Sequence, residues 1–354
     1  MFGSCKKDTN GDNNADAFDR KVMLTNVGNN LIVPAYNNFQ QAVIQYDSSV
    51  TDFCQNPDAS KLLTLQQKFK LAYIAWEYCC SFEFGPAEQL YLSKSVNTFP
   101  TDVTQINSNI QAGSYDLNAV MNLDAKGLPA FDYLLFGVGA DNSAILIKYT
   151  SDGDAGKRKQ YLMDLSADTK NKIGAVVAQW KDGYLDAFIN NTGTDIGSST
   201  SYLYNEFLKS YEGLKNYKFS LPLGRMAGQT TTSPEKVEAY YSGISGELAK
   251  HHWNSTKYIW EGRDLNGVDG AGFQEYLASV EGGGTLITQT LQQQANIEAT
   301  FAALPGGKLS DIIIQQFDKA DAINTELQKL TRFYKSDFSS LLGIAITFNS
   351  GDGD

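Results

Sequence analysis

The sequence predicts an all-α protein made of two helical bundles packed together. Apolar residues recur at three- and four-residue intervals through most of the chain, which is the spacing of amphipathic helices. The length of 354 residues suggests two domains. A charged, glycine-bearing stretch, Asp152 to Lys159, separates the halves. We therefore expect a tether at residues 1–16, a first bundle at 17–150 and a second bundle at 151–354.

The composition is that of a globular protein without a nucleic-acid partner. Hydrophobic residues make up 42% of the chain and charged residues 19%, which is ordinary for a folded domain. The net charge of −11 and the isoelectric point near 4.8 argue against nucleic-acid binding, because that function needs clustered Lys and Arg. No apolar run approaches the roughly 18 residues of a membrane-spanning helix.

The N-terminus resembles the end of a bacterial lipoprotein signal. Phe2-Gly3-Ser4-Cys5 is followed at once by a polar stretch, Lys6 to Asp16. This pattern predicts that Cys5 is acylated and that the polar stretch is a tether. The protein is then exported and anchored by lipid to the bacterial envelope, in the periplasm or at the outer-membrane surface. The alternative is a stray cysteine in a polar tail.

The first half begins with two long helices. From Ala17 to about Phe53 the apolar residues keep helical spacing, and Pro34 is expected to kink or divide the helix. Ser60 is a plausible N-cap for a second helix, so the two form an antiparallel pair. Shorter helices are expected at residues 103–110 and 115–122.

The second long helix closes in Trp76-Glu77-Tyr78-Cys79-Cys80-Ser81-Phe82-Glu83-Phe84-Gly85-Pro86. Glu77 and Glu83 lie six residues apart and so do not share one helix face. We interpret Glu77 as a solvated helix charge and keep Glu83 as a candidate ligand. Cys79 and Cys80 are expected to be buried free thiols, with a bridge from Cys54 as the alternative in an oxidising compartment.

The stretch Ala125 to Gly139, AKGLPAFDYLLFGVG, is the strongest candidate for a site. Gly127 can adopt a backbone angle that other residues avoid, and Pro129 suits the first position of a helix. Asp132 lies off the apolar row of this short helix, near the helix N-terminus, where the backbone dipole favours negative charge.

The second half is also helical. An apolar loop, Phe219 to Gly228, carries Arg225, which is a candidate to pair with a carboxylate or to bind an anion. A turn before the following helix contains Tyr241, Ser242 and Ser245, and Ser245 alternatively caps that helix. Helices are expected at residues 161–188, 203–214, 246–260, 273–280, 285–304 and 310–342.

The candidate site resembles the imelysin family. Imelysin-like proteins carry G-x-H-x-x-E at the entry to a helix, and Gly127-Leu128-Pro129-Ala130-Phe131-Asp132 has that outline. Pro129 stands in place of the histidine and has no lone pair for a metal, and the shorter Asp132 stands in place of the glutamate. The stretch from Trp76 to Pro86 is similar to a second family pattern, and the turn of Tyr241, Ser242 and Ser245 matches a third in position and character.

The resemblance implies an all-helical, two-bundle protein of the bacterial envelope. It also implies a link to iron or other metal uptake, with a site between the bundles and an outer-membrane or iron-uptake partner. The family was first described as peptidases. In this chain the only histidines, His251 and His252, are adjacent. They point about 100° apart on a helix, so they cannot form the one-faced pair of an HExxH metallopeptidase.

The sequence thus predicts a non-enzymatic protein that binds a small ligand or a metal at the junction of its bundles. Asp132 and Glu83 are the candidate oxygen ligands for a divalent or iron cation. The alternatives are a protein-interaction scaffold that binds no metal and, third, a metallopeptidase. The full set of candidate ligand-binding residues is Glu83, Gly127, Pro129, Asp132, Arg225, Tyr241, Ser242 and Ser245.

Overall fold

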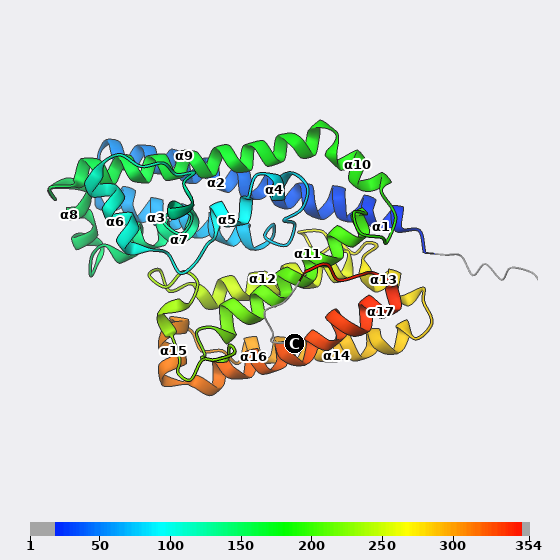
Figure 1. Ribbon diagram of the computed structural model, residues 1–354. Helices are drawn as coiled ribbons and strands as arrows, with labels where there is room; N and C mark the ends of the chain where they lie inside the picture. The colour runs from blue at the N-terminus through cyan, green and yellow to red at the C-terminus, as the bar shows by residue number, and fades with distance from the viewer. Residues whose placement is uncertain (1–17, 349–354) are drawn as a thin grey trace, which may run out of the picture.

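The computed structural model describes residues 18–348, and within this range all regular structure is helical (Figure 1). The all-α prediction is therefore confirmed. The predicted tether at residues 1–16 and the predicted acylation site, Cys5, lie outside the described residues. In the described part of the chain no single helix is long and apolar enough to span a bilayer. Two consecutive helical segments with a bend between them, Gly127–Gly137 and Asn142–Thr150, are together long and apolar enough to meet that criterion.

The first group of helices surrounds α2 (Figure 1). Helices α3 and α9 both pack along α2, and α6, α7 and α8 close the group around α9. The helices of this group are α1 (Arg20–Asn26), α2 (Val33–Gln55), α3 (Ala59–Glu77), α4 (Pro86–Gln89), α5 (Leu92–Val96), α6 (Val103–Ala112), α7 (Gly127–Asp132), α8 (Asn142–Thr150), α9 (Ala155–Gln179) and α10 (Leu185–Asn190).

The second group follows the loop at residues 191–198. Helix α14 packs against α16, and α12 packs against α11 and α13. The helices of this group are α11 (Ser199–Gly213), α12 (Ser245–Glu261), α13 (Phe273–Ala278), α14 (Gly283–Ala302), α15 (Leu309–Gln315), α16 (Phe317–Arg332) and α17 (Phe338–Leu342).

The passage from one group to the other differs from the predicted break at residue 151. Helix α9 begins at Ala155, within the charged stretch at residues 152–159, and packs along α2, and α10 packs against α1. In the packing of the helices, the second bundle therefore begins with α11. The charged stretch forms part of the turn between α8 and α9 and the first residues of α9. Its polar composition signals a loop but does not by itself mark where one domain ends. The division of the chain into separate domains stays a prediction.

Several predicted helix ends shift for local reasons. Pro34 lies in the first turn of α2, directly after a π-helical segment at Val27–Ile32, so the helix continues past it. Asp58, and not Ser60, caps α3 by accepting the N–H of Lys61. The predicted helix at 115–122 is reduced to a 3₁₀ turn at Val120–Asn122.

Other π-helical segments occur at Tyr133–Gly137, Leu214–Ser220 and Phe333–Asp337, and a kink with non-helical backbone at Asp182 and Gly183 separates α9 from α10. π-Helical segments are rare overall, and those that occur often lie at functional sites.

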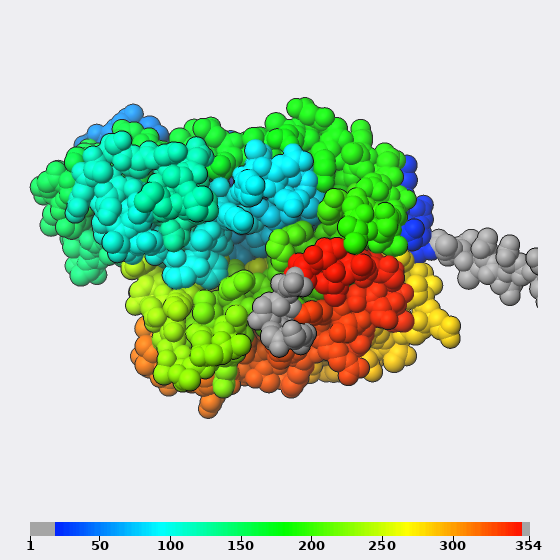
Figure 2. Space-filling model, viewed as in Figure 1, coloured from blue at the N-terminus to red at the C-terminus, as the bar shows by residue number. Residues whose placement is uncertain are grey.

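The two groups meet along a seam that crosses the molecule (Figure 2). At this junction α3 of the first group packs against α12 of the second. The C-terminal end of α3 therefore faces the second group, and so does the turn at residues 78–81 that follows it. Residues far apart in the sequence meet here, and the candidate site is built from them.

Candidate functional site

Helix α7 holds Asp132 at the junction. Gly127 has φ +73°, and a Cβ at this position would lie 2.3 Å from the carbonyl oxygen of Val96, so glycine is required there as the sequence predicted. Asp132 is buried, and its two carboxylate oxygens accept the backbone N–H groups of Tyr241 and Ser242 at 2.8 and 2.9 Å. Burial raises the pKa of Asp132 to about 6, and these hydrogen bonds oppose the rise.

A cavity of about 200 Å³ lies beside this contact. Pro129, Asp132 and Tyr241 line it, so three residues of the predicted set share one cavity. Asp132 accepts a hydrogen bond on each oxygen from the second bundle, and this makes it a link between the bundles. The remaining lining residues are Phe99, Pro100, Thr101, Glu235, Val237, Ala239 and Tyr240.

The other predicted residues lie elsewhere. Glu83 lines a second cavity, where it accepts the N–H and the hydroxyl of Ser93, so the structure does not bring the two predicted metal ligands into one cavity. Arg225 forms a two-point ion pair with Asp321 on the surface, because the apolar loop that carries it packs against α16. Ser245 donates its hydroxyl to the backbone carbonyl of Glu238.

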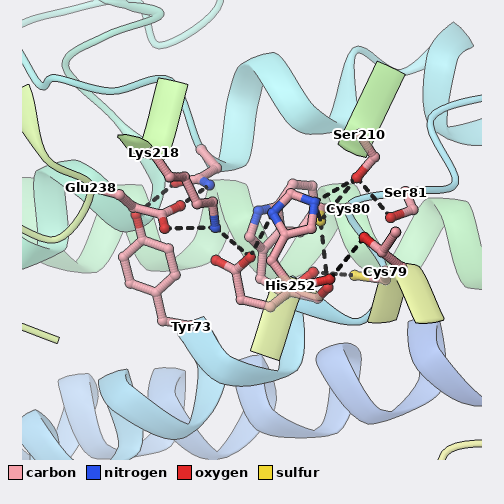
Figure 3. Close-up of polar contacts among 12 residues, drawn as sticks. Tyr73, Cys79, Cys80, Ser81, Ser210, Lys218, Glu238 and His252 are labelled. Carbon is pink, nitrogen blue, oxygen red and sulfur yellow. Dashed lines mark hydrogen bonds and ion pairs between the residues drawn. The ribbon is translucent and has the colours of Figure 1, made fainter. Parts of the chain in front are cut away.

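The most strongly charged buried group at the junction was not in the predicted set. The ammonium of Lys218 lies 2.5 Å from the Glu77 carboxylate and 2.7 Å from the Glu238 carboxylate (Figure 3). Glu77, Lys218 and Glu238 are 0%, 4% and 1% exposed. Glu77 ends α3 in the first bundle, while Lys218 and Glu238 come from the second. A buried ion triplet therefore joins the bundles.

Neutral polar groups extend the triplet on one side. Asn97 donates to Glu238 at 2.8 Å, and the hydroxyl of Tyr73 donates to Asn97 at 2.7 Å. The Tyr73 hydroxyl, the Asn97 amide and one oxygen of Glu238 thus satisfy one another, which matters because an unpaired buried polar group is costly. The segment that carries Glu238 is thereby attached to α3 and to the end of α5.

On the other side, His252 of α12 faces Glu77. Its Nδ1 lies 3.4 Å from a Glu77 oxygen, and its Nε2 lies 2.7 Å from the hydroxyl of Ser210. Ser81 contacts the same hydroxyl at 2.7 Å, and the Cys80 thiol lies 3.7 Å from Nε2 (Figure 3). Cys54, Cys79 and Cys80 are all free thiols, so the alternative of a bridge from Cys54 is wrong.

The second cavity, of about 280 Å³, opens beside this cluster. Both bundles contribute to its walls. Trp76, Glu77, Cys80, Glu83, Ser93, Lys94, Asn97 and Phe99 come from the first, and Glu206, Lys209, Ser210, Gly213, Tyr217, Lys218 and His252 from the second. The cavity is therefore a feature of the junction and not of either bundle alone.

Burial and mutual charge set the protonation of the cluster. Burial lowers the pKa of Lys218, but Glu238 and Glu77 raise it more, so the lysine stays an ammonium. Burial and the charge of Glu238 raise the pKa of Glu77 well above its usual range. Burial and then Lys218 lower the pKa of His252, so its imidazole is neutral. The cluster thus offers one excess acidic group and a neutral imidazole.

The contacts run from Ser210 to His252 to Glu77, the order found in serine hydrolases. Two features disfavour that chemistry. His252 Nδ1 makes no hydrogen bond to the carboxylate, and its low pKa makes it a weak general base at neutral pH. Ser210 also lies within helix α11, and not at a sharp turn that exposes a nucleophile. The arrangement is better suited to holding a ligand than to acyl transfer.

Reading Glu77 as a solvated charge was wrong, and a signal for its burial was present in the sequence. Glu77 comes four residues after the buried Tyr73, Lys218 four after Leu214, and His252 four after Leu248. Each polar residue thus continues the apolar row of its own helix. The apolar row of a helix does not show which polar residues of other helices these side chains will contact.

Comparison with known proteins identifies a matching family, a related sequence and solved structures of the same fold. A family model described as imelysin, which carries a peptidase name, matches residues 32–333. The iron-regulated protein A of Synechococcus elongatus is 20% identical over 274 residues, which covers 75% of this chain and 70% of that protein.

Two solved structures share the architecture. One, from Parabacteroides distasonis, is described as an iron-regulated protein A precursor; it has a TM-score of 0.74 and 16% identity and covers 91% of this chain and 95% of its own. The other is described as an imelysin-like protein from Psychrobacter arcticum. It has a TM-score of 0.73 and 19% identity, and the match covers 93% of this chain and 97% of that structure's chain.

The first prediction from this geometry concerns Lys218. We expect Lys218→Met to destabilise the fold by about 3–5 kcal/mol, because it leaves two buried carboxyl groups without their cation. Chemical denaturation measures the loss. Lys209→Met is the matched control: it breaks the exposed pair with Glu206 and should cost less than about 1 kcal/mol. Equal effects of the two variants would contradict the assignment.

The second prediction concerns Glu83. Burial raises its pKa to about 7, against the hydrogen bonds from Ser93. Its folded form holds a proton that the unfolded chain releases near the ordinary pKa of 4.5, so its contribution to stability is full below that pH and declines as the pH rises through 7. We expect Glu83→Gln to remove a decline of about 1–3 kcal/mol between these pH values. Denaturation curves that show the same decline in both proteins would refute this.

Proposed function

The chain belongs to the imelysin family, and we propose that it is a non-enzymatic envelope protein that binds a cation or small cationic ligand between its two bundles. The related iron-regulated proteins support an iron-related context. The observation that carries the proposal is the buried cluster of Glu77, Lys218 and Glu238 beside a cavity that both bundles line. Two acidic groups share one ammonium there, so the cluster favours an additional positive charge.

The position of the cluster supports binding over catalysis. Its charged groups are held by one another and by Asn97, so they form a fixed electrostatic environment. A histidine with a low pKa and a serine within a helix supply neither a good base nor an exposed nucleophile. We therefore propose a protein that captures or presents its ligand without altering it.

Lipid anchoring belongs to the same proposal. Acylation at Cys5, followed by the polar stretch at residues 6–16, would hold the two bundles close to an envelope membrane. An anchored binding protein of this kind would act beside an outer-membrane or iron-uptake partner. The acidic net charge of −11 suits a protein that attracts cations.

Anaerobic calorimetry and elemental analysis of the purified protein with Fe²⁺ test the proposal. We expect about one ion per chain, and at least tenfold weaker binding in Glu77→Gln, because that change removes a buried carboxylate at the cavity. The exposed Glu281→Gln is the control and should bind as the wild type does. No bound iron in the wild type, or peptide hydrolysis above a chelated blank, would overturn the proposal.

A further inference from the structure

Three metal-ligating side chains converge on one point at the junction. A carboxylate oxygen of Glu77, the Sγ of Cys80 and a ring nitrogen of His252 lie within 4.8 Å of one another. Glu77 ends α3, Cys80 lies in the turn that follows, and His252 belongs to α12. The group therefore assembles only when the two bundles pack together.

Two of these side chains have buried atoms without hydrogen-bond partners. Among the described residues, Glu77 Oε1 and His252 Nδ1 are both fully buried and unpartnered. The other atoms are already engaged: Glu77 Oε2 holds Lys218, and His252 Nε2 contacts Ser210. Because unpartnered buried polar atoms are costly, their joint presence at one place indicates a group that they bind.

The distances agree with a shared ion. His252 Nδ1 lies 3.4 Å from Glu77 Oε2, the oxygen that also holds Lys218; this is long for a hydrogen bond, and Oε1 of the same carboxylate is the one left without a partner. Two nitrogen or oxygen ligands at about 2.0–2.1 Å from one tetrahedral ion lie roughly 3.3 Å apart. Ser210, by accepting from Nε2–H, would fix the tautomer that leaves the Nδ1 lone pair free. A partner on the second ring nitrogen is a regular feature of histidine ligands.

The charges also balance. Glu77 and Glu238 share one ammonium, so the ionised cluster carries one excess negative charge. A divalent ion that displaces the proton of Cys80 makes the whole cluster neutral. Lys218 does not oppose this arrangement strongly, because Glu238 remains its ion-pair partner at 2.7 Å.

The cavity provides access. Cys80 is half-buried, and it lines the cavity of about 280 Å³ together with Ser210 and His252. A fourth ligand, either water or a donor from a bound molecule, can enter from this side. Three protein ligands with one open position are typical of zinc sites that bind a further molecule.

We propose that Glu77, Cys80 and His252 bind one divalent transition-metal ion of the Fe²⁺ or Zn²⁺ class at the bundle junction. The mixed set of oxygen, sulfur and nitrogen selects such ions over Ca²⁺ and Mg²⁺, which take oxygen ligands. This inference rests on the proposed function, since it names the ion and its ligands. It moves the metal site from the predicted Asp132 and Glu83 to residues on α3, the following turn and α12.

Titration of the reduced, full-length protein with Co²⁺ tests the inference, because cobalt reports its ligands in its absorption spectrum. We expect one equivalent to bind, with tetrahedral d–d bands and a thiolate-to-cobalt charge-transfer band. Cys80→Ser should abolish the charge-transfer band and weaken binding at least tenfold, and His252→Gln should weaken it similarly. Displacement by Zn²⁺ and, anaerobically, by Fe²⁺ then ranks the two ions.

The chain offers a matched control for each variant. Cys79→Ser and His251→Gln alter the adjacent cysteine and histidine, which lie outside the cluster, and should leave the spectrum unchanged. Thermal melts show whether each variant is folded. No charge-transfer band in the wild type, or a band that survives in folded Cys80→Ser, overturns the inference.

Iron binding that is lost in Glu77→Gln but unaffected by Cys80→Ser would defeat this inference and leave the proposed function standing. A cobalt band that needs Cys80, in a protein that binds no iron, would leave this inference standing and remove the iron-related context from the proposed function.

Discussion

The ammonium of Lys218 between Glu77 and Glu238 is the interaction on which the junction depends. Removing three charged groups from water is expensive, and their attraction offsets that cost only while all three remain in contact. Because Glu77 belongs to one bundle and the other two residues to the second, the contact requires one relative placement of the bundles. Apolar packing of α3 on α12 is less directional, so we propose that the ion triplet contributes to the specificity of the docking.

The short segment from Glu238 to Ser245 connects this triplet to the first cavity. Glu238 contacts Lys218 and Asn97, while the backbone N–H groups of Tyr241 and Ser242 donate to Asp132. Tyr240 and Tyr241 of this segment line the first cavity, its contact Lys218 lines the second, and Phe99 lines both. A ligand in the first cavity would contact a segment that both bundles hold in place.

The sequence predicted the helices well because their apolar periodicity is a local property. The predicted break at residue 151 falls before α9, which packs along α2, because a charged stretch such as 152–159 does not show which helices will pack together; the division into domains stays a prediction. The two segments predicted around Asp132 and Tyr241 are in contact across the junction, and their role as a binding site stays a prediction. The sequence pattern did not identify Lys218 and His252, whose common neighbour Glu77 lies more than 100 residues away in the sequence. Local spacing marks a residue as buried, but only tertiary packing selects its partner.

The central claim is that the bundle junction is a cation site built on Glu77, and anomalous diffraction from cobalt-loaded crystals tests it most directly. The account predicts one strong anomalous peak within bonding distance of Glu77, Cys80 and His252, at the wall of the cavity that both bundles line. A peak at Asp132 or only among surface carboxylates, with none at Glu77, would contradict it.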